Sequence, residues 1–152
     1  MYDFHDDTRL AILQARHEAL YLRADELSPA HLALGVLHTL GAAEVRLALP
    51  APGAFESLCL ALGGRSEPAP VIASEILYSD AARDAIAGAM AAAAGGAGAR
   101  TILPLHLLAG ILSPRPAGGT EISAPGPIAV VLERAGLGAS SLQSLLALPR
   151  PR

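Results

Sequence analysis

The chain has 152 residues, of which 52% are hydrophobic and 16% are charged, so it can bury a core and is not a disordered segment. Its net charge of −3 argues against nucleic acid as a partner, because phosphate contacts need clustered cations and the basic residues are scattered. All 11 basic residues are arginines, which excludes mechanisms that need a lysine, such as a P-loop ATPase or a Schiff base.

The termini and the cysteine content predict a cytoplasmic protein. The N-terminal sequence MYDFHDD is acidic and has no apolar run, which is not typical of a signal peptide. The uncharged run at residues 85–99 is shorter than the roughly 20 residues of a membrane-spanning helix, so no membrane partner is expected. Cys59 is the only cysteine and lies in the apolar run SLCLAL, where burial should raise the pKa of its thiol.

The first predicted helix follows the acidic N-terminus. Its residues recur at spacings of three and four, as on one helical face: Leu10, Leu13, His17, Leu20 and Ala24. Asp6 or Asp7 is expected to cap the first turn, because a carboxylate accepts a backbone N–H and suits the positive end of the helix dipole. No stretch of the chain alternates like a strand.

Three further helices are predicted before the middle of the chain. Ser28 can cap the second helix, with Pro29 at the first helical position, where no N–H is missed. Gly41 is expected to end this helix, because glycine commonly follows the last helical residue. Short third and fourth helices are predicted at about 42–49 and 54–62.

The helical pattern restarts after a linker. Residues 64–74, GRSEPAPVIAS, are rich in Pro and Ser, which is typical of a connecting segment. Ser79 or Asp80 can cap the next helix. Four helices are predicted in this half, at about 81–94, 104–112, 127–135 and 139–148. Residues 113–127, rich in Pro and Gly, are expected to form a flexible insertion.

Two segments of the chain resemble each other. SPAHLALGVL and ILPLHLLAGIL each contain the pattern Pro-x-His-Leu-x-x-Gly-(Val/Ile)-Leu. The pattern places His31 and Gly35 in the first segment where His106 and Gly110 lie in the second. A residue that recurs at two helix starts is better explained as a structural fixture than as half of a metal site, so we interpret both histidines as helix-packing residues.

This arrangement resembles the Clp N-terminal repeat domain, the module that precedes the ATPase modules of ClpA-, ClpB- and ClpC-type AAA+ unfoldases. Phe4, ILQARHEAL and SPAHLALGVL correspond to the leading aromatic residue, first helix and signature of the family's repeat. Tyr78 and Ser79 correspond to the aromatic residue and helix cap of the second copy, and LPLHLLAGIL and VVLERAGLGASSL to its signature and closing helices. The resemblance covers essentially the whole chain.

The resemblance implies an all-α fold of about eight helices, a pseudo-twofold duplication of a four-helix repeat known as the double Clp-N motif. Residues 1–152 would form one domain, with repeat 1 at about 4–63, the linker at 64–74 and repeat 2 at about 75–148.

The function that the resemblance implies is docking. In that family the domain binds adaptors and substrate proteins and passes them to the ATPase ring. Because a Walker A motif needs a lysine, this chain is expected to be an ATP-independent protein- or peptide-binding module without a cofactor. It would act as an adaptor, decoy or regulator of a Clp unfoldase–protease, with a Clp ATPase, the ClpP protease or substrate proteins as partners.

Two alternatives to this role stay open. One is a structural accessory subunit of the ClpP ring, by analogy with plant Clp-repeat proteins; the other is an enzyme, which only scattered His and Asp residues favour. Actinobacterial relatives also bind cyclic peptide antibiotics, which adds a further class of partner to the docking hypothesis.

The chain departs from the family at its phosphoarginine site. ClpC-type domains place a glutamate before each signature histidine, and Ala30 and Leu105 stand there in this chain. A guanidinium needs a carboxylate partner, so we expect phosphoarginine binding to be weak or absent.

Candidate ligand-binding residues lie at the start of each repeat: Tyr2, Phe4, His5 and Asp6 in the first, and Tyr78, Ser79 and Asp80 in the second. Helix capping explains the polar ones, and the sharper hypothesis is a surface for basic or apolar peptide segments. No catalytic residue and no metal site is predicted, because the patterns Cys-x-x-Cys, His-x-x-x-His and Gly-x-Ser-x-Gly do not occur.

Overall fold

The computed structural model describes residues 3–49, 53–94, 101–116 and 126–147, and these are mostly helical, as expected for the all-α class. The described helices are α1 (Asp6–Tyr21), α2 (Pro29–Ala48), α3 (Ala54–Ala61), α4 (Asp80–Ala94), α5 (Pro104–Leu112), α6 (Pro127–Arg134) and α7 (Ala139–Leu146). Four strands of two residues each accompany them: β1 (Asp3–Phe4), β2 (Glu26–Leu27), β3 (Leu77–Tyr78) and β4 (Thr101–Ile102).

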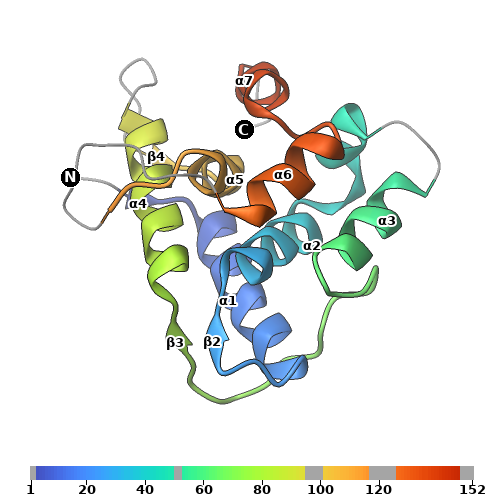
Figure 1. Ribbon diagram of the computed structural model, residues 1–152, viewed down its shortest axis with the longest axis vertical. Helices are drawn as coiled ribbons and strands as arrows, with labels where there is room; N and C mark the ends of the chain where they lie inside the picture. The colour runs from blue at the N-terminus through green and yellow to red at the C-terminus, as the bar shows by residue number, and fades with distance from the viewer. Residues whose placement is uncertain (1–2, 50–52, 95–100, 117–125, 148–152) are drawn as a thin grey trace.

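Two helix pairs form the centre of the molecule (Figure 1). Helix α1 packs on α2 and α4 packs on α5, and α2 and α5 contact each other, so the two pairs share one core. The buried side chains of α2 and α5 are mainly leucines, whereas those of α1 and α4 are mainly alanines. Small side chains on the outer helix of each pair let it approach the inner helix closely.

One glycine in each inner helix sets this close approach. A Cβ atom at Gly35 would collide with the backbone of Ala11 and lie 2.8 Å from the backbone nitrogen of Ala15. A Cβ atom at Gly110 would collide in the same way with the backbone of Ala85. Neither position can therefore take a side chain unless the helix pair moves apart.

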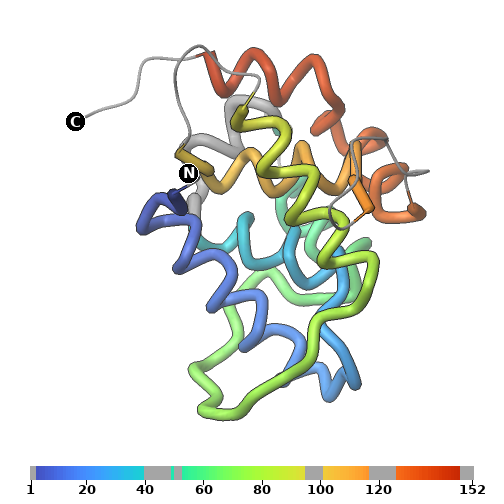
Figure 2. The backbone as a smooth tube through the Cα atoms, turned by 90° about the vertical axis from the view of Figure 1, so that its left-hand side faces the viewer, coloured from blue at the N-terminus to red at the C-terminus, as the bar shows by residue number. Residues whose placement is uncertain are grey.

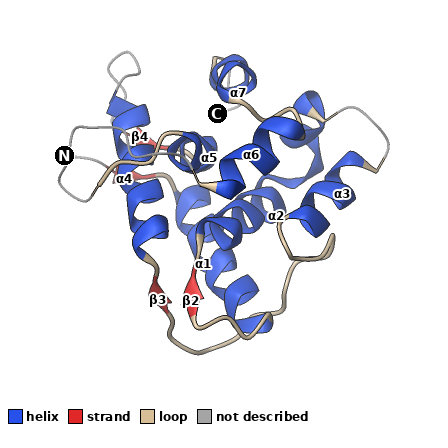
Figure 3. Ribbon diagram, in the orientation of Figure 1, coloured by secondary structure: helices blue, strands red, loops and turns tan. Residues whose placement is uncertain are grey.

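The strands form two short parallel ladders, each of which joins the first half of the chain to the second (Figure 3). β1 pairs with β4, and β2 pairs with β3. The backbone N–H of His5 donates to the carbonyl of Ile102 at 3.1 Å, and that of Ser79 donates to the carbonyl of Leu27 at 2.9 Å. The sequence predicted no strand, because a ladder of two residues is too short to produce an alternating pattern.

The prediction that Gly41 ends the second helix is wrong. Helix α2 continues from Pro29 to Ala48, so the third helix expected at 42–49 is the end of α2 and the described residues form seven helices. One glycine inside a helix costs only about 1 kcal/mol relative to alanine, and its alanine-rich surroundings favour continuation.

The face of α1 that packs on α2 is not the periodic face seen in the sequence. Ala11, Ala15 and Ala19 are fully buried, whereas Leu10 is 54% exposed and Leu13 is 43% exposed. The contact with α2 is too close for leucine, so alanine occupies it and the leucines lie on the outer side.

The predicted linker passes α1 on its way to α4, as Figure 2 shows. Hydrogen bonds from α1 to backbone atoms at Ala69, Ile72 and Ser74 hold it there. The predicted insertion at 113–127 lies largely outside the described residues.

Candidate functional site

The predicted ligand-binding residues form two groups at different ladders. Phe4 lies in β1, which pairs with β4, and Tyr78 lies in β3, which pairs with β2. In Figure 1, β2 and β3 lie at the lower end of α4 and β4 lies near its upper end, so the groups do not converge on one site. Tyr2 lies outside the described residues.

One polar residue of each group caps a helix. His5 is the N-cap of α1, and its Nδ1 accepts the backbone N–H of Asp7 at 3.1 Å. Asp6 and Asp7 therefore lie in the first turn and are exposed, and the cap expected from one of them comes from His5. In the second group, Ser79 Oγ accepts the N–H of Ala82 at 3.0 Å, and Asp80 is fully exposed at the helix start.

The signature histidines occupy equivalent positions. His31 Nδ1 accepts the backbone N–H of Ser28 at 2.9 Å, and His106 Nδ1 accepts that of Leu103 at 2.8 Å. Both residues are buried, at 9% and 8% exposure. Burial lowers the pKa of His31, which favours the neutral ring that this acceptor role requires.

An apolar pocket of about 350 Å³ lies where α2, α4, α5 and α6 meet. Its walls come from small and apolar residues of both halves of the chain, among them Pro29, Ala30, Ala81, Ile111 and Ile128. Among the described residues, Asp84 on α4 is the one charged residue in its lining. Ala30, the residue before His31, also lines this pocket, and no described residue of its own helix contributes a carboxylate there.

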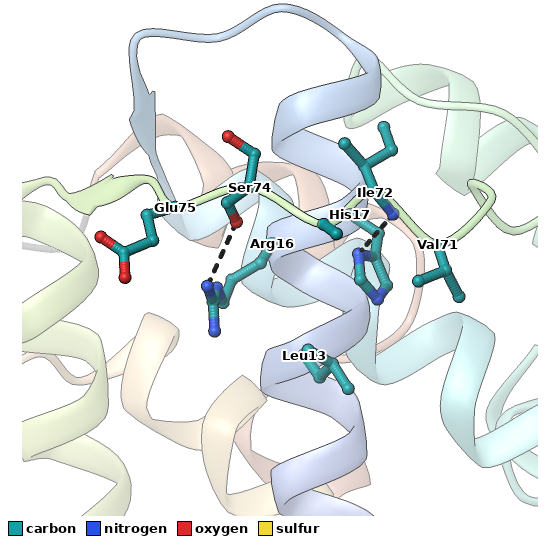
Figure 4. A pocket seen from close by; sticks show the side chains of 8 residues that line it. Leu13, Arg16, His17, Val71, Ile72, Ser74 and Glu75 are labelled. Carbon is teal, nitrogen blue, oxygen red and sulfur yellow. Dashed lines mark hydrogen bonds between the residues drawn. The ribbon is translucent and has the colours of Figure 1, made fainter.

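A groove of about 460 Å³ lies between α1 and the linker (Figure 4). Leu13, Arg16 and His17 lie on one face of α1 and line it, and linker residues 71–75 cross that face. Arg16 Nη2 donates to the carbonyl of Ser74 at 3.3 Å, and His17 Nδ1 accepts the backbone N–H of Ile72 at 3.2 Å.

Two further residues of α1, Gln14 and Glu18, form hydrogen bonds with the linker backbone at Ala69. Gln14 Nε2 donates to the carbonyl of Ala69 at 3.0 Å, and the N–H of Ala69 donates to Glu18 Oε1 at 3.2 Å. Glu18 Oε1 also lies 3.2 Å from His38 Nε2, which lies 3.0 Å from the carbonyl of Arg65. Because both neighbours of His38 Nε2 are acceptors, this nitrogen carries a proton and donates to them.

The charge of Arg16, which lines the groove, also acts on Tyr78, one of the predicted ligand-binding residues. Burial raises the pKa of the Tyr78 hydroxyl, and the positive charge of Arg16 partly offsets that effect. None of the residues predicted at the repeat starts lines either the groove or the pocket. Local sequence patterns could not find these sites, because hydrogen bonds between residues 55 apart build the groove and segments of four different helices line the pocket.

Cys59 is a buried core residue, as predicted. Burial, with smaller contributions from the charges of Glu18 and Glu56, raises the pKa of its thiol to about 11, so it is a poor nucleophile near neutral pH. The described part of the chain contains no cluster of three potential metal ligands from His, Cys, Asp and Glu. Nor does any helix within those residues have the length and apolar character needed to cross a membrane.

Comparison with known proteins leaves the family open. The chain matches no protein-family model, and no curated protein is similar to it in sequence. What these sites can bind follows from their residues and geometry.

Proposed function

We propose that this protein is an ATP-independent module that binds proteins or peptides, acting as an adaptor, decoy or regulator of a Clp unfoldase–protease in the cytosol. The observation that carries the proposal is the apolar pocket at the junction of α2, α4, α5 and α6, with a single carboxylate in its lining. The remaining support comes from contacts that occur in both halves of the chain.

These recurring contacts favour a duplicated repeat, the architecture of the Clp N-terminal domain. Gly35 meets the backbone of α1 as Gly110 meets that of α4. His31 accepts a backbone N–H three residues before it, and His106 does the same. The two ladders are also related in this way. In one, β1, which precedes α1, pairs with β4, which precedes α5; in the other, β3, which precedes α4, pairs with β2, which precedes α2.

The pocket fits an apolar peptide side chain next to a basic one. Its volume lies within the range of ligand-binding cavities, and apolar walls favour an aliphatic or aromatic group. Asp84 is the one charged residue that the described part of the chain contributes to the lining, so an arginine or lysine beside the apolar residue would complete the contact. Elements of both halves form the pocket, as expected of a docking site between two repeats.

Fluorescence anisotropy with short labelled peptides tests the pocket. A peptide that contains Leu-Arg and ends in a C-terminal amide should bind, and its Leu-Glu counterpart should bind at least about tenfold more weakly, because the second carboxylate would repel Asp84. Ala81→Phe should fill the pocket, and Asp84→Asn should remove the preference for arginine. Glu133→Gln, an exposed change on α6, serves as the control for loss of one charge. Equal affinity for both peptides would refute this site.

Affinity capture tests the proposed partners. The full chain should retain a Clp ATPase or ClpP from lysate, and the Ala81→Phe variant should retain less. Co-migration with the ClpP barrel without any ATPase would favour the alternative role, a structural accessory subunit of the protease ring. Cyclic peptides with apolar side chains should compete with the Leu-Arg peptide for the pocket.

A further inference from the structure

One donor of a largely buried histidine, His17, opens into the groove between α1 and the linker. His17 Nδ1 accepts the backbone N–H of Ile72, so the proton of the neutral ring is on Nε2. His17 is only 6% exposed and lines the groove, and within the described residues no hydrogen bond involves its Nε2. An N–H that opens into a groove and has no hydrogen bond within the described residues can donate to a ligand with an acceptor atom.

A cation lies beside this donor. Arg16 also lines the groove, and its guanidinium uses Nη2 to donate to the carbonyl of Ser74. A guanidinium has five N–H donors, and Arg16 forms no ion pair with any described carboxylate. Arg16 and His17 together therefore offer a positive charge and several donors to one side of the groove.

The rest of the groove is apolar and uncovered. Leu13 lies one turn before Arg16 and His17 on the same face of α1, as Figure 4 shows, and is 43% exposed. Val71, on the linker side, is 81% exposed. A ligand that covered these two side chains would remove apolar surface from water. Glu75 adds one acceptor at the linker side.

We propose that this groove binds the C-terminal end of a peptide whose last residue is apolar. The terminal carboxylate accepts from Arg16 and from His17 Nε2, and the last side chain covers Leu13 and Val71. Glu75 accepts a backbone N–H of the peptide, which a fatty acid could not supply. The inference rests on residues that do not line the pocket of the proposed function, so each site can fail without the other.

The test compares two forms of one labelled peptide. A peptide without basic residues that ends in Ala-Leu with a free carboxylate should bind the full chain, measured by fluorescence anisotropy. The same peptide with a C-terminal amide should bind at least about tenfold more weakly, because a charge-assisted contact is lost. Equal binding of the acid and the amide would overturn the proposal, and so would dodecanoate competing as well as the peptide.

Matched variants on α1 locate the binding. Arg16→Gln should weaken binding of the free acid about tenfold, whereas Arg9→Gln, an exposed change on the same helix, should not. Leu13→Gln should weaken it as well, whereas Leu10→Gln, a 54% exposed leucine outside the groove, should not. Asp84→Asn should leave this binding unchanged. If the Arg9 and Leu10 variants lose as much affinity as the Arg16 and Leu13 variants, the groove is not the site.

Discussion

Histidine side chains in this protein repeatedly accept hydrogen bonds from backbone N–H groups. Nδ1 accepts a backbone N–H at His5, His17, His31 and His106. An imidazole nitrogen accepts a hydrogen bond only through its free lone pair, so in each case Nδ1 carries no proton in this arrangement. A recurring His three residues after a helix start was visible in the sequence, whereas the contact of His17 with the linker was not, because its partner lies 55 residues away.

His31 should make stability depend on pH. Its pKa lies below its usual value of 6.5 because it is buried, so the unfolded chain binds more protons than the folded one as the pH falls below 6.5. The free energy of unfolding should therefore be highest above pH 6.5 and fall below it. His31→Gln keeps an acceptor for the N–H of Ser28 and removes the titration, so urea unfolding should show a smaller loss between pH 7.5 and 5. The same loss in both proteins would contradict this assignment.

Cys59 should react slowly with alkylating reagents. With a pKa of about 11, only about one thiol in a thousand is ionised at pH 8. Iodoacetamide should therefore modify the folded protein far more slowly than the urea-unfolded chain, as followed by mass spectrometry. Fast modification of the folded protein would show that Cys59 is accessible and ionised.

The two helix pairs depend on glycines at their closest approach. Gly35→Ala and Gly110→Ala should each destabilise the protein by about 1–3 kcal/mol, because the added methyl group meets backbone atoms of the neighbouring helix. Gly126→Ala is the control, since a Cβ there meets nothing within 4 Å and its φ is negative. Urea denaturation measures all three. A Gly126 variant as unstable as the others would point to a general effect of glycine replacement.

Helix boundaries could be predicted where a local sequence signal sets them, and could not be predicted where contacts with the rest of the fold set them. Helix α5 begins and ends as expected because Pro104 starts it and Ser113 and Pro114 follow its end. Helix α2 runs through Gly41 because one weak local signal did not outweigh its surroundings. The anchoring of the linker depends on hydrogen bonds across more than 50 residues, which no local pattern reports.

The candidate sites show the same division. The sequence singled out the repeat starts, and the structure places those residues in caps and ladders. The charge of the pocket comes instead from Asp84. Nothing in the sequence around Asp84 distinguishes it from other polar residues of α4, and only the structure places it in one pocket with Ala30 and Ile128. The expectation that phosphoarginine binding is weak or absent remains a prediction.

One core and two ladders join the two halves of the chain, and the described residues line at least two hollows with different chemistry. The pocket at α2, α4, α5 and α6 is apolar with one negative charge, whereas the groove on α1 contains both Arg16 and Glu75. Under the docking function proposed above, the pocket and the groove would each receive a separate feature of a peptide.

The most direct test of the docking function is an NMR titration of the ¹⁵N-labelled full chain with the amidated Leu-Arg peptide. The account predicts saturable shifts of backbone signals at residues 28–30, 81–85 and 126–129, and no comparable shifts in α7, which does not line the pocket. Shifts that do not saturate, or that appear mainly outside these residues, would contradict it.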